Sequence, residues 1–245
     1  MNRTIHPLIP LFANIARDIF PDQDLRTEVL SAPERPDAAV FAFTGHHVVA
    51  ADVDPAWVAA RCPPGDLIAP ISPAFLTALA EQLGLRHGAP CLVLCAPALI
   101  GEPGLPLIPL DLAPDHPRVA RALHYRLDIR TYQTEEGNGT LTIGRGLGGR
   151  WEADFGVAPA ARGQGLGRAL AVAARHVIEP DEALFMQVAL ANIASMRAIL
   201  GAGFLPIGAE VLYSGLPPRQ RGTPRSPCRP SDRLARGSGM TQNAR

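Results

Sequence analysis

A glycine-rich stretch between two arginines holds the residue types best suited to chemistry in this chain. It reads Arg162-Gly-Gln-Gly-Leu-Gly-Arg168. Before it, Trp151 to Val157 places bulky, β-prone side chains at alternate positions, which predicts a strand. After it, apolar residues recur every three or four positions, which predicts a helix; these are Leu166, Leu170, Ala173 and Val177. We therefore expect a tight turn from a strand into a helix.

Such a turn is suited to binding an anion. Glycine lets backbone N–H groups approach a ligand closely and tolerates unusual dihedral angles. The start of a helix offers unpaired N–H groups and the positive end of the helix dipole. Arg162 and Arg168 add positive charge on either side. The stretch predicts a site for a phosphate or pyrophosphate; a tight connection that binds no ligand is the alternative.

The order Arg-x-x-Gly-x-Gly, filled here by Arg162, Gly165 and Gly167, resembles the acetyl-CoA-binding motif of the GNAT-type N-acetyltransferase superfamily. In that family the motif also lies between a strand and a helix. A second block follows in the family's order: a strand at 184–190, a helix opened by Asn192, then Gly203-Phe204 and a last strand to Tyr213. The resemblance covers about residues 116 to 214.

The resemblance implies an α/β fold of mixed α+β type, a GNAT-like acetyltransferase fold with a splayed, mainly antiparallel sheet. We expect three parts. A small N-terminal α/β unit spans residues 1–115, the GNAT-like domain spans 116–214, and an Arg- and Pro-rich disordered tail spans 215–245. The proline-rich run from Leu105 to Asp115 is the expected boundary. The N-terminal unit is expected either to form one wall of the acceptor pocket or to be a degenerate copy of the same fold.

The resemblance also implies the reaction: transfer of an acetyl group from acetyl-CoA, as co-substrate, to an amine. Backbone groups of the strand end would pair with the pantetheine arm, the Val157 amide would face the oxyanion, the turn would bind the pyrophosphate, and Asn192 would reach the pantetheine. The implied acetyl-CoA-binding residues are Phe155, Gly156, Val157, Arg162, Gly163, Gln164, Gly165, Leu166, Gly167, Arg168 and Asn192.

Acid–base groups are less clear from the sequence. An amine of pKa about 10 is mostly protonated at neutral pH, so a base or a water chain helps. Glu152 and Asp154 lie on the right strand, and one of them could serve as the base; the alternative for each is a surface or salt-bridged carboxylate. The family often has a Tyr at the position of Ile199, as general acid. Tyr213 and Tyr132 are possible substitutes, of which Tyr213 is our candidate; a thiolate can also leave without an enzymic acid.

Composition limits the other classes of function. The chain has 245 residues and a formal net charge of zero, so it does not point to nucleic-acid binding as a whole. The tail is basic, and we expect it to be inert rather than to bind nucleic acid. No cysteine spacing suggests a zinc site, so no metal is expected. We expect the cysteines to be buried free thiols. No stretch could span a membrane and no signal peptide is evident, so we expect a cytoplasmic protein without a membrane partner.

Two further patterns are read as structural. His46 and His47 are adjacent on an expected strand and point to opposite faces, so we expect one packed and one exposed histidine rather than a metal pair. Gly144 to Gly149 contains Gly-x-Gly-x-x-Gly, but a strand rather than a helix follows, so we expect a turn between strands. The main alternative to an enzyme is a non-catalytic acyl-CoA-binding regulatory module. The acceptor, the acyl-chain length and the oligomeric state are not specified by the sequence.

Overall fold

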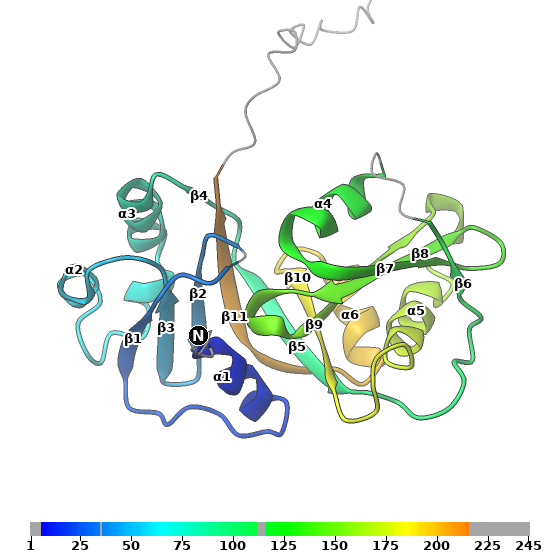
Figure 1. Cartoon of the computed structure of the whole chain (residues 1–245), viewed down its shortest axis with the longest axis horizontal. Coiled ribbons are helices and arrows are strands. Elements are labelled where there is room, and N and C mark those ends of the chain that lie inside the picture. The colour runs from blue at the N-terminus through cyan, green and yellow to red at the C-terminus, as the bar shows by residue number, and fades with distance from the viewer. Residues whose placement is uncertain (1–5, 35, 112–115, 216–245) are drawn as a thin grey trace, which may run out of the picture. The chain divides into compact units, whose positions relative to one another are not determined.

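The computed structural model describes residues 6–34, 36–111 and 116–215. The expected tail at 215–245 therefore lies almost entirely outside the described residues. The described residues form one compact unit (Figure 1). Its helices are α1 (Leu8–Ile15), α2 (Pro55–Ala59), α3 (Pro73–Leu83), α4 (Pro117–Tyr125), α5 (Leu166–Ala174) and α6 (Ile193–Gly201). Short 3₁₀ turns are η1 (Ala69–Ile71), η2 (Leu147–Gly149) and η3 (Pro159–Ala161).

The strands of the described residues form one 11-stranded sheet. They are β1 (Arg26–Leu30), β2 (Ala38–Phe43), β3 (His46–Ala50), β4 (Arg86–His87), β5 (Cys91–Pro97), β6 (Ile108–Pro109), β7 (Leu127–Gln133), β8 (Gly139–Arg145), β9 (Trp151–Val157), β10 (Ala183–Ala189) and β11 (Leu205–Ser214). Their order is β1-β3-β2-β11-β5-β10-β9-β8-β7-β6, and β4 pairs with β11. Within the described residues only β1–β3 and β9–β10 pair in parallel. The predicted fold class, mixed α/β with a mainly antiparallel sheet, is confirmed.

Strand β5 connects the two halves of the chain. It belongs to the expected N-terminal unit, yet it lies between β10 and β11 and is antiparallel to both (Figure 1). Strand β11 in turn pairs with β2 of the N-terminal half. The proline-rich run near residue 110 therefore does not separate two sheets, because strands from both sides of it alternate in one sheet.

Helices pack on both faces of the sheet centre, which explains the apolar runs of β5 and β10. Leu94, Leu184 and Met186 join the core beneath α5 and α6, whereas Val93 and Phe185 join the core beneath α1. Successive side chains of a strand point to opposite faces, so a strand buried on both faces must be apolar throughout. A third core packs α2 and α3 against β2, β3 and β11.

Local signals in the sequence set several helix ends. The Asp54 and Ser72 side chains accept hydrogen bonds from the Ala56 and Phe75 amides and cap α2 and α3. Gly84 ends α3 in the left-handed conformation, with φ of 64°. Gly144 to Gly149 forms the end of β8 and the turn η2 before β9, in agreement with its interpretation as a turn between strands.

The adjacent histidines His46 and His47 differ from the expectation that one is packed and one is exposed. Both are buried, His46 at 8% and His47 at 3% exposed, and β3 packs between neighbours on both sides. His46 is paired with Asp24 rather than left in solvent. The thiols of Cys62, Cys91 and Cys95 are free, and burial raises the pKa of Cys62 to about 11 and that of Cys95 to about 12. They therefore stay protonated at neutral pH. Cys228 lies outside the described residues.

Candidate functional site

Strands β9 and β10 are paired only at their beginnings. Trp151 pairs with Leu184 and Glu152 with Phe185, and no later pair forms, although both strands continue for several residues. On its other side β9 stays paired with β8 along its whole length. The two parallel strands therefore separate towards their C-terminal ends, where β9 leads into the glycine-rich turn.

The end of β9 presents backbone groups to this gap. The Ala158 amide donates to the Asn138 carbonyl on the β8 side, at 2.8 Å. Because the backbone groups of successive strand residues point to opposite sides, those of Val157 and Phe155 point away from β8, towards β10. Since β10 has already diverged, this edge of β9 has no strand partner there. The Val157 carbonyl accepts a hydrogen bond from Arg162, and an extended ligand could bond to the other backbone groups.

The turn that follows is open and rich in backbone donors. Gly163 and Gly165 have φ of 78° and 84°, which favours glycine, and a Cβ on either would meet nothing within 4 Å. Helix α5 begins at Leu166, directly after Gly165. The Ala169 amide bonds the Gly165 carbonyl, but the amides of residues 163–168 make no hydrogen bond within the described chain. These donors and the helix dipole make a site for an anion.

Gly167 serves the packing of this helix. A Cβ there would lie 3.1 Å from Cε2 of Phe155, so its absence lets the first turn of α5 lie against the ring at the end of β9. Leu170, Ala171 and Ala174 of α5 are fully buried in the core that also holds Ala153. The strand end and the helix start are thereby fixed relative to each other.

The polar side chains of the turn differ in direction. Arg162 Nε donates to the Val157 carbonyl at 3.2 Å, and Gln164 Nε2 donates to the Ala160 carbonyl, also at 3.2 Å. Both are exposed and fold back onto the chain that precedes them. The Arg168 side chain instead lies beside Gly201 of α6, with its Cδ 3.5 Å from the Cβ position of that glycine.

Asn192 opens α6, as the sequence predicts for a cap. Its Oδ1 accepts a hydrogen bond from the Ser195 amide at 3.2 Å, and its side-chain amide nitrogen makes no hydrogen bond to the residues that the structure describes. It follows β10 after the turn Leu190-Ala191, and its own backbone amide bonds the Ala189 carbonyl, so it lies close to the end of the strand that borders the gap. Ile199 is 3% exposed and packs in the core below α5 and α6, and so offers no polar group there.

Glu152 lies in a buried ion-pair network. Its carboxylate accepts from Arg150 Nε at 2.8 Å and from Arg126 Nε at 3.3 Å, and its side chain is 4% exposed. Burial alone would raise the pKa of Glu152, but Arg150 and Arg126 outweigh it and hold the pKa below its ordinary value. Such a carboxylate is a weak base that solvent does not reach.

Asp154 lies two residues after Glu152 on β9, nearer the gap, and is more exposed than Glu152. Its Oδ2 accepts from Arg126 Nη1 at 2.8 Å, and its side chain is 24% exposed. Since Ala153 points into the core below α5, Asp154 points to the opposite face of the sheet. Of the two carboxylates on β9, it is the one near both the unpaired strand edge and solvent.

Tyr213 lies in another part of the structure. It is fully buried in the core formed by α2, α3 and β11, and its hydroxyl donates to the Leu76 carbonyl at 3.2 Å. Burial raises the pKa of the Tyr213 hydroxyl. β5 and β10 lie between β11 and β9, so the structure does not bring Tyr213 together with the glycine-rich turn.

Three charged residues of the network were not singled out from the sequence: Arg126, Arg150 and Glu210. The Arg150 side chain, 1% exposed, contacts Glu152 and Glu210 and lies over the Phe12 ring, 4.4 Å from its centroid. Burial raises the pKa of Glu210, despite the opposing effect of Arg150. A signal was available, because Glu210 is the only charged residue in the run Leu205 to Ser214, which is otherwise largely apolar.

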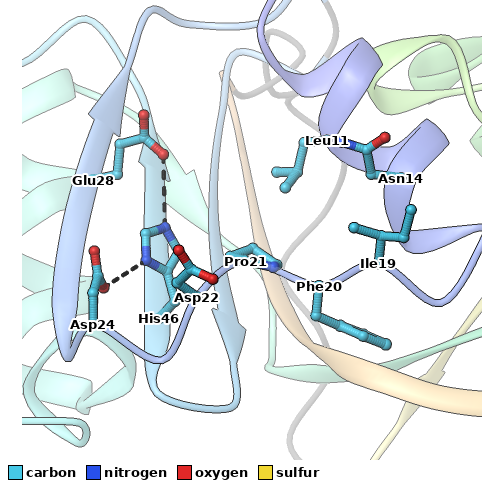
Figure 2. Close-up of a pocket in the computed structure, with 9 residues that line it drawn as sticks. All are labelled: Leu11, Asn14, Ile19, Phe20, Pro21, Asp22, Asp24, Glu28 and His46. Carbon is cyan, nitrogen blue, oxygen red and sulfur yellow. Dashed lines mark hydrogen bonds and ion pairs between the residues drawn. The ribbon is translucent and has the colours of Figure 1, made fainter.

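A cavity of about 290 Å³ lies apart from these residues, in the N-terminal half (Figure 2). Asp22, Asp24, Glu28 and His46 line it on one side, and Leu11, Ile19 and Phe20 on the other. The ring of His46 lies between Asp24, at 2.9 Å, and Glu28, at 3.6 Å. None of the residues expected at the acetyl-CoA site borders it.

In the part of the chain that the structure describes, no group of three or more His, Cys, Asp or Glu side chains could hold a metal ion. None of its helices is both long enough and apolar enough to cross a membrane.

No protein-family model and no curated protein matches the sequence. Solved structures do. A GCN5-related N-acetyltransferase from Kribbella flavida shares 18% identity over 83% of this chain and 95% of its own, with a TM-score of 0.42. A GNAT-family acetyltransferase from Colwellia psychrerythraea shares 14% identity over 59% of this chain, with a TM-score of 0.34. A GCN5-related N-acetyltransferase from Sphaerobacter thermophilus shares 17% over 58%, with a TM-score of 0.35.

These structures carry the name of the family that the sequence motif resembles. The chain spans less than two thirds of two of them, 63% of the Colwellia and 56% of the Sphaerobacter protein.

Proposed function

We propose that the protein is an acetyl-CoA-dependent N-acetyltransferase that acts on an amine. The observation that carries the proposal is the run of unpaired amides at residues 163–168, at the start of α5 and next to the unpaired end of β9. The amides suit a pyrophosphate, and the strand edge suits the amide-containing pantetheine arm. The two lie in the order in which these groups occur along acetyl-CoA.

In the reaction, the acceptor nitrogen attacks the thioester carbonyl carbon. A C–N bond forms and the C–S bond breaks, so the products are an acetylated amine and the free thiol of CoA. The Val157 amide donates to the oxyanion of the tetrahedral intermediate, an interaction that can contribute several kcal/mol, about 3–4 in a measured case. The proton of the attacking amine leaves through a base, and the departing thiolate takes up a proton from solvent.

Asp154 is the proposed base. Its partial exposure and its place on β9, beside the unpaired edge, support this role. Asn192, at the far side of the gap, would hold the pantetheine through its side-chain amide nitrogen. Glu152, by contrast, is committed to two arginines, and Tyr213 to the Leu76 carbonyl. We assign both of these residues to the stability of the fold.

A non-catalytic acyl-CoA-binding module is the second candidate. Two observations favour it: Ile199 stands in the core where the family often has its general acid, and Asp154 is already paired with Arg126. The two candidates share the binding site and differ in turnover. Release of the CoA thiol above the uncatalysed rate, in the presence of a panel of small amines, would exclude the module.

The test of the shared site is calorimetric titration with acetyl-CoA. Gly165→Glu puts bulk and negative charge where the pyrophosphate is proposed to bind. Gly65→Glu is its matched control, because Gly65 has φ of 88°, also has nothing within 4 Å of its Cβ position, and lies outside the turn. We expect micromolar binding by the wild type and by Gly65→Glu, and none by Gly165→Glu. A folded wild type that binds no acetyl-CoA would refute the proposal.

A further inference from the structure

The Arg162 side chain turns back to the strand that precedes it. Its Nε donates to the carbonyl of Val157, so this side chain bridges the first residue of the glycine-rich turn and the last residue of β9. The alternation of β9 places this carbonyl on the unpaired edge, because the neighbouring Ala158 amide bonds towards β8. The guanidinium therefore lies at the gap where β9 has lost its partner β10.

This contact satisfies a group that the sheet leaves open. A strand end without a neighbour on one side has unpaired carbonyls and frays more readily than a paired one. Arg162 supplies the missing donor at the last residue of β9. Because a guanidinium holds its N–H groups in a fixed plane, it can fix the direction of this peptide.

The contact also determines where the positive charge of Arg162 lies. With Nε on the Val157 carbonyl, the guanidinium lies against the strand end. The backbone amides of residues 163–168 are donors that an anion can use without Arg162. Arg168, which lies on the side of α6, belongs to the same helix start as those amides.

We propose that Arg162 is a positioning residue, which holds the end of β9 so that the Val157 amide points into the gap, while backbone amides and Arg168 hold the pyrophosphate. This inference rests on the proposed function. It places the positive charge of Arg162 next to the atom that becomes negative during acyl transfer. Arg162 therefore stabilises the transition state, so its loss should lower kcat. Loss of a pyrophosphate contact should instead weaken ground-state binding and raise Kd.

The first experiment compares two acyl donors. Acetyl-CoA carries the pyrophosphate, and S-acetyl-pantetheine has the same thioester and arm without phosphate. For Arg162→Ala we expect kcat for thiol release to fall about 10- to 100-fold with both donors, while Kd for CoA stays within about twofold. Arg162→Lys, which keeps the charge, should recover part of kcat. Arg168→Ala should instead raise Kd for CoA and KM for acetyl-CoA.

The matched control is Arg61→Ala. Arg61 Nη1 also donates to a backbone carbonyl, that of Trp57 at 3.1 Å, far along the chain from the turn. Its removal should leave kcat and Kd as in the wild type. A defect of Arg162→Ala that is confined to acetyl-CoA and accompanied by weak CoA binding would overturn the inference, since it would assign Arg162 to the pyrophosphate. Unchanged kinetics with both donors would overturn it as well.

A second readout does not need turnover. Hydrogen exchange in the ligand-free protein reports how firmly the end of β9 is held. Amides of residues 155–158 should exchange about tenfold faster in Arg162→Ala than in the wild type, and no faster in Arg168→Ala. Equal exchange in Arg162→Ala and the wild type would overturn the positioning role. A wild type that releases no thiol from either donor would refute the catalytic proposal, and exchange alone would then decide what Arg162 does.

Discussion

Arg150 donates from Nη2 to Oε2 of Glu210 at 2.7 Å, and each of these side chains is only 1% exposed. The contact joins the residue before β9 to β11, past the two strands that lie between them in the sheet. Through Glu152 and Arg126 it continues to Asp154, which we propose as the base. The buried network thus links the candidate site to β11, the strand that pairs with β2 of the N-terminal half.

Glu152 is expected to matter for stability. Glu152→Gln removes the charge that Arg126 and Arg150 share and leaves each of these buried guanidinium groups with one carboxylate, Asp154 or Glu210. Loss of one partner from a buried ion pair typically costs about 3–5 kcal/mol. The free energy of unfolding in urea measures this. Glu182→Gln is the control, because Glu182 pairs with Arg145 at a side-chain exposure of 36% and should cost at most about 1 kcal/mol. Equal losses in the two variants would contradict the structural role of Glu152.

Glu210 should make stability fall as the pH rises. Its folded pKa lies above its unfolded one, so its contribution to stability is present below the unfolded pKa and is lost as pH rises through the folded pKa. Glutamine does not titrate. The unfolding free energy of the wild type minus that of Glu210→Gln should therefore decrease from acidic to neutral pH.

For Glu152→Gln, the difference in unfolding free energy from the wild type should change with pH in the opposite direction. The folded pKa of Glu152 is depressed, so its contribution is present above the unfolded pKa and is lost as pH falls through the folded one. The difference between the wild type and Glu152→Gln should therefore increase with pH. Parallel slopes for the two variants would mean that the directions assigned to these carboxylates are incorrect.

Asp154→Asn tests the proposed base. Loss of a general base typically lowers the rate about 10²–10⁴-fold. We expect kcat/KM for an amine acceptor to fall within that range, with acetyl-CoA affinity retained. Tyr213→Phe is the comparison: it removes the hydroxyl that donates to Leu76 and should cost about 1 kcal/mol of stability with little effect on kcat/KM. Wild-type kcat/KM in Asp154→Asn would rule out Asp154 as the base.

Removal of residues 1–105 tests whether the C-terminal half folds alone. The deletion takes away β5, which pairs with both β10 and β11, so both strands lose their partner at the sheet centre. We expect the truncated chain to show no cooperative thermal transition in calorimetry, whereas the intact chain should show one. A sharp transition of the truncated chain, together with acetyl-CoA binding, would show that 106–245 is an independent domain.

Most local structure follows from the sequence. The alternation in Trp151 to Val157, the glycines after it and the apolar spacing of α5 predict a strand, a turn and a helix, and the structure has all three. The caps Asp54, Ser72 and Asn192 act on the amides two or three residues ahead. These features depend on residues close together in the chain, so their physical cause is contained in a short segment.

The partners of the strands could not be predicted in the same way. The residues of β5 show only that it is apolar on both faces, which fits any central strand. Its place between β10 and β11 depends on contacts with residues about 90 to 120 positions later in the chain, and no local pattern records them. The same reason applies to Tyr213, whose partner Leu76 comes from the other half of the chain.

The sequence by itself determined that an open, glycine-rich turn follows a strand and begins a helix, because glycine dihedrals and free helix amides are properties of the local chain. Only the tertiary structure decided how the side chains around that turn are used. It buried Glu152 between two arginines, left Asp154 partly in solvent, and brought Arg162 to the Val157 carbonyl. Burial and ion pairing depend on which strands and helices surround a residue, and that surrounding is a property of the whole fold.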